Sequence, residues 1–469
     1  MDVTSAHIRT LYFIGLERKM YRNIINDLTA WQSEEGNRIL YVKGAYGVGK
    51  TWAVKDFATA YFDAQNYVDL SVNTGFRNVI AGTKEPDDEY EDSILLSESD
   101  IRNLSIETRL ADVDFLLEQH FDNADISKCI LIFDEVQCIP DCAEFFHEYK
   151  KLHPDYTICL IASTMEITEY EYLHPDVFDI VRMRPMTFEE YMIANQCMPL
   201  IAAIEDQKST PLSRDDEEKA IALLRDYLLV GGMPGPVSTF IKSKNYDIAR
   251  KKQLEILDYY ETLIRKSYSF ATSQRCRRIW SSIPKQLTND NKKFMYRYVE
   301  ENARSREYSQ ATYNLCNLGL ARKLPRLKSG DIPLEDNADY KSYEFFLIDH
   351  GLLRALYELP CDGELTARDI LCEKNGAIAE QYVFQELSEK VGYLYYWVSG
   401  ATARVPFVYE GEENPIPVDI RINPNKKAQN IKTFKAKNPN AEISIKISLE
   451  QVSLEGSVLN IPAYGLWNM

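Results

Sequence analysis

Two short groups of residues have the types and spacing needed for phosphate chemistry. Residues 44–51 read GAYGVGKT, which fits the pattern G-x-x-x-x-G-K-[ST], and Asp134 and Glu135 end the apolar run CILIFDE. Glycines let backbone N–H groups surround phosphate oxygens, a lysine reaches the β- and γ-phosphates, and a hydroxyl ligates Mg²⁺. An acid at a strand end holds the metal, and a neighbouring carboxylate polarises the attacking water. Together the two groups predict a nucleoside triphosphate site.

The roles expected of these residues follow from their chemistry. Lys50 would bind phosphate and Glu135 would activate water, so these two are the expected catalytic residues. ATP and Mg²⁺ are the expected ligands, with Thr51 and Asp134 on the metal, since the chain has no Asn-Lys-x-Asp element for guanine. The expected nucleotide-binding residues are Gly44, Ala45, Tyr46, Gly47, Val48, Gly49, Lys50, Thr51 and Trp52.

Two polar residues at the end of a further apolar run extend this site. Ser163 and Thr164 end the run that starts at residue 157. A polar side chain there would sense the γ-phosphate, although Ser and Thr also form turns at strand ends. The main motifs have simpler alternatives too, namely a flexible glycine-rich turn and a strand that ends in two solvated acids.

The elements that must position these residues alternate along the first third of the chain. Short apolar segments at 38–44, 66–72, 128–135 and 157–163 predict strands, and the spacing of apolar residues over 52–61 predicts a helix. This alternation is typical of βαβ units and indicates an α/β fold with a parallel sheet. Ligands of such sheets bind at the carboxyl ends of the strands, where both motifs lie.

Beyond this sheet the chain changes character twice. Thr187 to Glu190 have the spacing of a capping box that opens a helix, so we expect the first domain to span residues 1–204. A polar linker over 205–218 leads into helical segments and a basic module, giving a second region over 205–330. Apolar runs near 393–398, 405–410 and 416–422 predict strands in a last domain over 331–469. The acid-rich stretch 86–100 is expected to be a solvated loop.

Composition excludes several classes of protein. The chain of 469 residues is 45% hydrophobic and 12% aromatic, as in packed globular proteins. No apolar run reaches the roughly 18 residues that a membrane span needs, and the N-terminal residues lack a secretory profile. We therefore expect a cytoplasmic protein without a membrane partner. The nine scattered cysteines are expected to be reduced thiols.

The formal net charge of −17 disfavours a nucleic-acid partner for the chain as a whole. The charge is unevenly distributed, however. Residues 265–330 hold 15 Lys and Arg against four acids, a net charge of +11, so the rest of the chain carries −28. The basic module is therefore the place where a polyanion would bind.

The ordered series of motifs resembles a specific family, the bacterial and archaeal AAA-family ATPases with a C-terminal domain of unknown function of restriction-endonuclease-like type. The likeness runs from GAYGVGKT and ILIFDEVQ through RPMTFEEY, LLVGGMPGPV and FFLIDHGLL to GAIAEQYVFQEL and IPAYGLW, and so covers nearly the whole chain. It implies an ATPase core, a helical lid, a winged-helix module and an inactive nuclease-type domain. The oligomeric state and the cellular role stay open.

The sequence departs from the family pattern at two places. Tyr46 and Gly47 stand where relatives usually have Arg-Gln, and Pro175 and Asp176 stand near the usual Gly-Arg. If that arginine completes a neighbour's site, its absence slows hydrolysis by on the order of 10³–10⁵.

Within the basic module, residues 305–319 resemble a recognition helix, and residues 320–330 resemble the wing that follows it. Such a helix enters the major groove while Lys and Arg hold phosphates. A DNA partner and a protein partner both stay open, because winged helices also serve as protein contacts and because the module can pack on the chain's own acidic surface. The candidate nucleic-acid contacts are Lys292, Lys293, Arg304, Arg306, Arg322 and Lys323.

In the last domain, the resemblance points to a degenerate nuclease site. Glu380 matches the helical acid of such nucleases, while Asp419 and Arg421 stand where an acid-x-Lys pair is needed. Pro406 occupies the place of the central metal-binding acid, and Arg cannot replace the lysine readily. We expect a scaffold or a binding surface here rather than a nuclease.

These observations lead to one main expectation for function. The chain is expected to be an ATPase that couples ATP and Mg²⁺ to a conformational change and to a DNA or protein partner. The alternative is a binding module that ATP stabilises without being hydrolysed. An ATP-gated nuclease is disfavoured by Pro406.

Overall fold

A computed structural model describes residues 20–33, 38–82, 105–121, 129–400, 403–423 and 429–469. Its chain divides into two compact units, one formed by Arg22–Arg184 and the other by Pro185–Met469. The acid-rich stretch 86–100 lies outside the described residues. Within them, no helix is both long and apolar enough to cross a bilayer.

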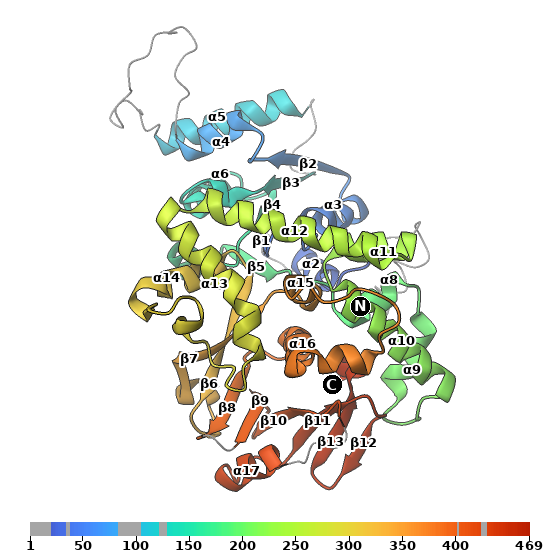
Figure 1. The fold of residues 1–469 in the computed structure, drawn as a ribbon. Coiled ribbons are helices and arrows are strands. Elements are labelled where there is room, and N and C mark those ends of the chain that lie inside the picture. Colours follow the sequence, from blue (N-terminus) through green and yellow to red (C-terminus); the bar gives the residue numbers. More distant parts are fainter. Residues whose placement is uncertain (1–19, 34–37, 83–104, 122–128, 401–402, 424–428) are drawn as a thin grey trace. The chain divides into compact units, whose positions relative to one another are not determined.

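The first unit is built on a five-stranded sheet, and all of its strand pairs are parallel (Figure 1). The strand order is β2-β3-β4-β1-β5. The strands are β1 (Ile39–Lys43), β2 (Ala64–Asp69), β3 (Cys129–Asp134), β4 (Thr157–Ala162) and β5 (Phe178–Arg182). This confirms the predicted parallel α/β fold. The strand β5 was not predicted, since its sequence FDIVR mixes polar and apolar residues.

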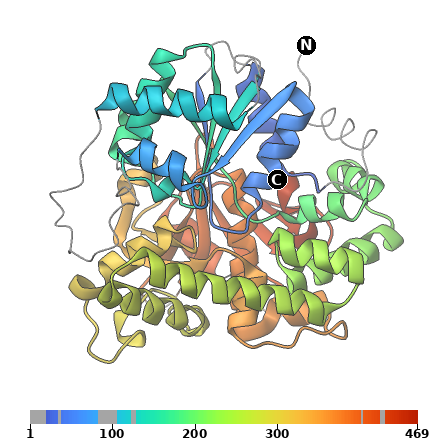
Figure 2. The same ribbon diagram turned by 90° about the horizontal axis from the view of Figure 1, so that it is seen from above.

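Helices cover both faces of this sheet (Figure 2). One face packs through Phe76, Val113 and Phe146, which come from three different helices, into a single apolar core with the strands. Those helices are α4 (Thr74–Ala81), α5 (Ile106–His120) and α6 (Cys142–Leu152). On the other face α2 (Ile24–Ser33) packs on α3 (Lys50–Tyr61), with Trp31 and Phe57 in ring contact. Because both faces are covered, the central strands read as continuous apolar runs.

The second unit begins with helices. The capping box expected at Thr187 is confirmed: its side chain accepts from the Glu190 backbone and opens α8 (Phe188–Ala194). The rings of Phe188 and Tyr191 contact the Tyr227 ring of α10 (Arg214–Val230) in tilted arrangements, so α8 belongs to the second unit and the division lies at residue 184 rather than near 204. The following elements are α9 (Met198–Asp206), α11 (Pro234–Ser243), α12 (Tyr246–Ser267), α13 (Phe270–Thr288), η4 (Tyr296–Tyr298) and α14 (Ser305–Asn317).

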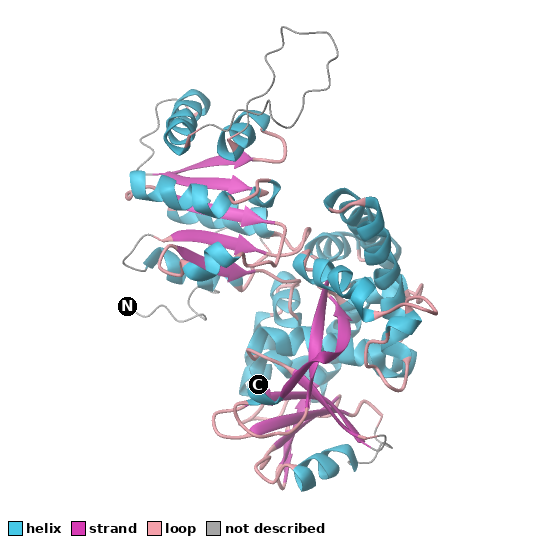
Figure 3. Cartoon of the chain, turned by 90° about the vertical axis from the view of Figure 1, so that its left-hand side faces the viewer, coloured by secondary structure: helices cyan, strands magenta, loops and turns pink. Residues whose placement is uncertain are grey.

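An eight-stranded mixed sheet forms the rest of this unit, in the order β12-β13-β11-β10-β9-β8-β6-β7 (Figure 3). Its strands are β6 (Ala321–Leu327), β7 (Ala338–Leu347), β8 (Tyr395–Ser399), β9 (Ala403–Glu410), β10 (Pro415–Ile420), β11 (Ser444–Ser448), β12 (Ser453–Glu455) and β13 (Val458–Pro462). The helices α15 (His350–Leu356), α16 (Ala367–Lys390) and α17 (Gln429–Lys437) accompany it. The strands predicted near residues 393–422 correspond to β8, β9 and β10.

The wing predicted over residues 320–330 is part of this same sheet. The strand β6 pairs antiparallel with β7 and parallel with β8. The expected boundary at residue 330 therefore falls in the connection between two paired strands. Backbone hydrogen bonds join the two regions that the sequence divides, which the local pattern of residues cannot reveal.

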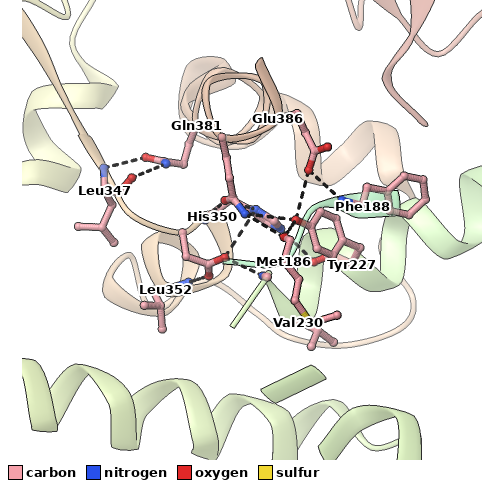
Figure 4. Close-up of polar contacts among 12 residues, drawn as sticks. Met186, Phe188, Tyr227, Val230, Leu347, His350, Leu352, Gln381 and Glu386 are labelled. Atoms are coloured by element: carbon pink, nitrogen blue, oxygen red, sulfur yellow. Dashed lines mark hydrogen bonds and ion pairs between the residues drawn. The ribbon is translucent and has the colours of Figure 1, made fainter. Parts of the chain in front are cut away.

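A buried network of polar groups ties together distant segments of the second unit (Figure 4). Asp349 accepts from the backbone of Gly232 at 2.6 Å and of Leu352 at 2.9 Å. Tyr227 donates its hydroxyl to the Met186 carbonyl at 2.5 Å, and the Phe188 backbone donates to Glu386 at 2.9 Å. These hydrogen bonds hold four segments together, because buried polar groups need their partners. The segments are 186–188, 227–232, 349–352 and α16.

Gly231 and Gly232 are required by this packing. Gly231 has a φ of 81°, and a Cβ on either glycine would overlap Asp349 or the carbonyl of Met186. At these glycines the backbone therefore approaches the polar network closely.

We predict that Glu386 makes the stability of the protein depend on pH. Burial raises the pKa of Glu386 to about 8, although the Phe188 N–H opposes this. The folded state therefore binds a proton more tightly than the unfolded state, and this contribution to stability is lost as pH rises from about 5 to 8, at up to about 1.4 kcal/mol per pH unit. Glu386→Gln should flatten this dependence in denaturant unfolding curves. Glu218→Gln, at an exposed site, is the control, and equal slopes in both variants would contradict the assignment.

Candidate functional site

The glycine-rich loop follows β1 and leads directly into α3. Gly47 has a φ of 84° and Gly49 a φ of 97°, in the left-handed region that favours glycine. A Cβ on Gly44 would overlap the carbonyl oxygen of Met183. The helix α3 begins at Lys50, so its N-terminal N–H groups and dipole face the loop, as a phosphate requires.

Lys50 is a buried cation at the centre of the loop. Its Nζ donates to the carbonyls of Gly44 and Ala45, each at 3.0 Å, and to Ser163 Oγ at 3.2 Å. Burial lowers the pKa of Lys50 to about 8, although Glu135 and Asp134 oppose this. An anion of high charge placed here would raise this pKa again, since it would pair with the buried ammonium.

Asp134 ends β3 and gathers three hydrogen bonds. Its carboxylate accepts from Thr51 Oγ1 at 2.6 Å, from Tyr67 OH at 3.0 Å and from the Glu135 backbone at 2.8 Å. The carboxylate and the Thr51 hydroxyl form a pair of oxygen donors, the type that Mg²⁺ prefers. The two predicted metal ligands are thus adjacent, and they fit a hard divalent cation.

Glu135 adopts a left-handed φ of 57°, at which a non-glycine residue is uncommon. Ser163 Oγ donates to Glu135 Oε1 at 2.8 Å, and the amide of Gln137 donates to Glu135 Oε2. Ser163 therefore contacts both Lys50 and Glu135. The sheet order explains this, because β4 lies between β1 and β3 and brings Ser163 between the residues that follow those strands.

The remaining predicted residues divide between core and surface. Ala45 and Val48 are buried, whereas Tyr46 is 37% and Trp52 is 43% exposed. Thr164 Oγ1 accepts from the Glu166 backbone at 3.1 Å, which is a local turn contact. This contact is compatible both with a γ-phosphate sensor and with a simple turn former. Of the two sensor candidates, Ser163 is the one whose hydroxyl contacts Lys50.

Several residues that support this site were not predicted from the sequence. Arg22 donates to the Val48 carbonyl at 2.5 Å and to the Arg184 carbonyl at 2.6 Å. Lys43 forms a buried pair with Glu171 at 2.5 Å. No local pattern marks these contacts, since Arg22 lies 26 residues from Val48 and 162 from Arg184, and Lys43 lies 128 residues from Glu171. Gln137 lies two residues after Glu135, so its closeness to that motif was the available signal, whereas Tyr67 comes from β2 and no motif includes it.

The candidate nucleic-acid residues have different surroundings in the second unit. Arg304 and Arg306, at the start of α14, are exposed, as is Lys323, while Lys293 and Arg322 are half-buried. Lys292 is only 4% exposed and pairs with Glu380 at 3.0 Å. This corrects the prediction for Lys292, because a buried cation paired inside the protein is not available to a phosphate.

The expected nuclease-like residues lie in two sets of ion pairs. Arg404 on β9 donates to both carboxylate oxygens of Glu380 at 2.8–2.9 Å and of Glu344 at 2.6–2.9 Å. Asp419 pairs with Arg421 at 2.8 Å. Burial by itself would raise the pKa of Glu380, but Arg404 and Lys292 lower it to about 2. Within the described residues, no three His, Cys, Asp or Glu side chains converge as metal ligands.

The positive charges beside Glu344 and Glu380 are the Arg404 guanidinium and the Lys292 ammonium. Glu344 is fully buried, and burial raises its pKa despite the opposing effect of Arg404. Two carboxylates this close need a positive partner, and Arg404 supplies it bidentately to each. The expectation of a scaffold, made from Pro406 and Arg421, stays a prediction.

Comparison with known families assigns the first unit. Residues 36–192 match the family model described as AAA domain. The chain therefore contains an AAA-type P-loop ATPase domain. Residues 375–464 of the chain match a domain of unknown function, DUF4143, and residues 221–362 match another, DUF8612. No curated protein matches the chain.

Among solved structures, similarity is distant and partial. The structure of C. elegans PCH-2 is 13% identical with a TM-score of 0.29, covering 49% of this chain and 65% of PCH-2. A Pif1 helicase from Bacteroides, in complex with ADP-AlF3 and ssDNA, is 13% identical with a TM-score of 0.20, covering 44% of this chain and 49% of the helicase. The chain thus spans less than two thirds of the length of either structure.

We predict that Ser163→Ala lowers ATP turnover without abolishing ATP binding. Lys50 keeps its two carbonyl contacts, but Glu135 loses the hydroxyl that orients it, and a misplaced group of this kind costs up to about 100-fold in rate. Steady-state hydrolysis and equilibrium nucleotide binding would separate the two effects. Thr164→Ala, which removes the neighbouring hydroxyl that accepts from the Glu166 backbone, is the matched control. Equal turnover by the two variants would contradict the role of Ser163.

We predict that Arg404→Ala destabilises the second unit by about 3–5 kcal/mol, because it leaves Glu344 and Glu380 facing each other without their shared cation. Denaturant unfolding measures this change. Arg214→Ala removes an exposed Arg–Glu pair and should cost less than about 1 kcal/mol. An unfolding free energy for Arg404→Ala equal to that of the control would show that the cluster does not stabilise the fold.

Proposed function

We propose that this chain is an ATPase that couples ATP and Mg²⁺ to a conformational change acting on a DNA or protein partner. The observation that carries the proposal is the joint contact of the Ser163 hydroxyl with Lys50 and Glu135. A glycine-rich loop with a lysine is by itself a phosphate site. Hydrolysis also needs a carboxylate that is held in position. Glu135 is such a carboxylate, and Ser163 holds it near Lys50.

In this proposal each side chain has a distinct task. Lys50 exchanges its carbonyl contacts for the β- and γ-phosphates, while Thr51 and Asp134 hold Mg²⁺, which when bound neutralises charge on those phosphates. Glu135 accepts a proton from the attacking water. Ser163, in contact with both Lys50 and Glu135, is placed to respond to the γ-phosphate, and Tyr67 orients Asp134 through its hydroxyl.

The chain offers a short covalent route for coupling. Met183 donates its backbone N–H to the Lys43 carbonyl at 2.8 Å, and Arg22 joins the carbonyls of Val48 and Arg184. Two residues after Arg184, Met186 is held by Gly232 and Tyr227 in the buried network of the second unit. Pro185 alone separates Arg184, whose carbonyl is bonded to Arg22, from Met186, whose carbonyl is bonded to Tyr227. A shift of the loop on nucleotide binding would therefore act on the segment that enters the second unit.

The partner would bind through the second unit. Its order α13, η4, α14 and the antiparallel strands β6 and β7 supports the winged-helix interpretation of residues 265–347. Residues 331–469 are proposed to be a restriction-endonuclease-like domain without activity, in view of Arg404 and Pro406. The exposed arginines Arg304 and Arg306 at the start of α14 are proposed contacts for a DNA or protein partner.

We predict that Glu135→Gln keeps ATP binding and loses turnover by about 10²–10⁴-fold, since the amide cannot accept the proton of the attacking water. Steady-state phosphate release and binding of a fluorescent ATP analogue, each with and without Mg²⁺, measure the two properties. Lys50→Ala should lose nucleotide binding. Glu118→Gln on α5, an exposed carboxylate, is the matched control.

Two outcomes would change the proposal. Turnover that persists in Glu135→Gln would exclude Glu135 as the group that activates water. Tight ATP binding by the unaltered protein without any turnover would favour the alternative, a binding module that ATP stabilises, and would point to the missing arginine near Asp176.

A further inference from the structure

A hollow of about 360 Å³ lies in the second unit between α13 and η4, and its lining includes neither Arg304 nor Arg306. Its lining contains three cationic side chains and no acid. The lining residues are Gln274, Arg277, Arg278, Ser281, Ser282, Lys285, Tyr298 and Val299. We call it the α13 groove. Five of the lining residues from α13 are not buried. Four of these, at positions 274, 278, 281 and 285, recur at helical spacing, so one face of α13 forms a wall of the groove.

The arginines of the α13 groove are fixed by acids from outside its lining. Arg278 donates to Glu300 at 2.6 Å and to Tyr308 OH at 3.2 Å, and Arg277 donates to Glu261 at 3.1 Å. A guanidinium has five N–H donors, so one ion pair leaves others available. The buried Nε of Arg277 has no hydrogen-bond partner among the described residues. The acids thus reduce the local charge but also hold the guanidinium groups in place.

The other end of the α13 groove combines two cations with an aromatic ring. Lys285 Nζ lies 5.3 Å from the centre of the Tyr298 ring, and the Arg297 guanidinium lies 5.2 Å from the same centre. Both cations are exposed, whereas the ring is half-buried. Neither cation has an ion pair of 4 Å or less among the described residues.

We propose that the α13 groove binds the phosphodiester backbone of a nucleic acid. The inference rests on the DNA partner in the proposed function and assigns its contact to α13 and η4. Arginine donors and the Ser281 hydroxyl match phosphate oxygens, and the half-buried ring of Tyr298 is an aromatic surface of the kind on which a base stacks. An acidic protein segment would use the charges but not the ring. The surrounding residues 265–330 carry +11 in a chain of net charge −17, so a polyanion is drawn to this region.

The test is fluorescence anisotropy of labelled single-stranded and duplex oligonucleotides with the full chain, without nucleotide and over a range of salt. Lys285→Gln combined with Arg297→Gln should weaken binding at least about tenfold at low salt. It should also reduce the slope of log K against log salt by about 1.4–1.8, or 0.7–0.9 for each phosphate contact removed. Both side chains are exposed, so circular dichroism should be unchanged. The matched control is Lys219→Gln combined with Lys242→Gln, on the exposed surface of α10 and α11, which should bind as the unaltered protein does.

Four results would overturn the proposal. Two of them are that the unaltered protein binds no oligonucleotide at low salt, or that the control variant loses as much affinity as the test variant. The others are that only Arg304→Gln and Arg306→Gln on α14 weaken binding, or that polyglutamate displaces the labelled oligonucleotide as effectively as unlabelled oligonucleotide does. The last result would identify an acidic protein segment as the ligand. Because no ATP is present, failure here is independent of ATP turnover, and Glu135→Gln should bind the oligonucleotide normally. The pair of assays therefore distinguishes a wrong partner surface from a wrong ATPase assignment.

Discussion

The burial of Lys50 is the constraint around which the first unit is arranged. An ammonium group removed from water needs partners, and here it takes two loop carbonyls and one hydroxyl. The carbonyls require the loop to curl around the side chain, and the loop can do so because Gly47 and Gly49 adopt positive φ. The hydroxyl requires β4 to end beside β1. The same position of Ser163 then orients Glu135, so the need to satisfy one cation also sets the geometry of the carboxylate.

A second, half-buried cation organises the sheet of the other unit in a similar way. Arg404 links a strand, β7, to the helix α16 through Glu344 and Glu380, and Lys292 adds the segment before η4. In a metal-dependent nuclease, carboxylates converge on a divalent ion instead. Here the positive charge is part of the chain, so it remains in place whatever the solution contains. This gives the region a structural role and joins the basic module to the strands that follow it.

The two arrangements meet along the chain at residues 183–188. On one side of Pro185 the backbone is hydrogen bonded to β1, and Arg22 ties it to the glycine-rich loop; on the other side it is bonded to Gly232, Tyr227 and Glu386. Buried polar networks that are fully satisfied have few alternative arrangements. In the proposed function, a displacement of the glycine-rich loop would reach the second unit through this short segment.

The sequence by itself determined the glycine-rich loop, the helix that starts at Lys50, the acids after β3 and the capping box at Thr187. These features depend on backbone conformations and spacings within a few residues, so local residue types decide them. The tertiary structure decided that Ser163 contacts Lys50, 113 residues away, and that Lys292 is buried against Glu380 instead of facing solvent. It also decided that β6 joins the C-terminal sheet. The physical reason is the same in each case: strand order and helix packing choose which distant groups meet, and no local pattern of residues records that choice.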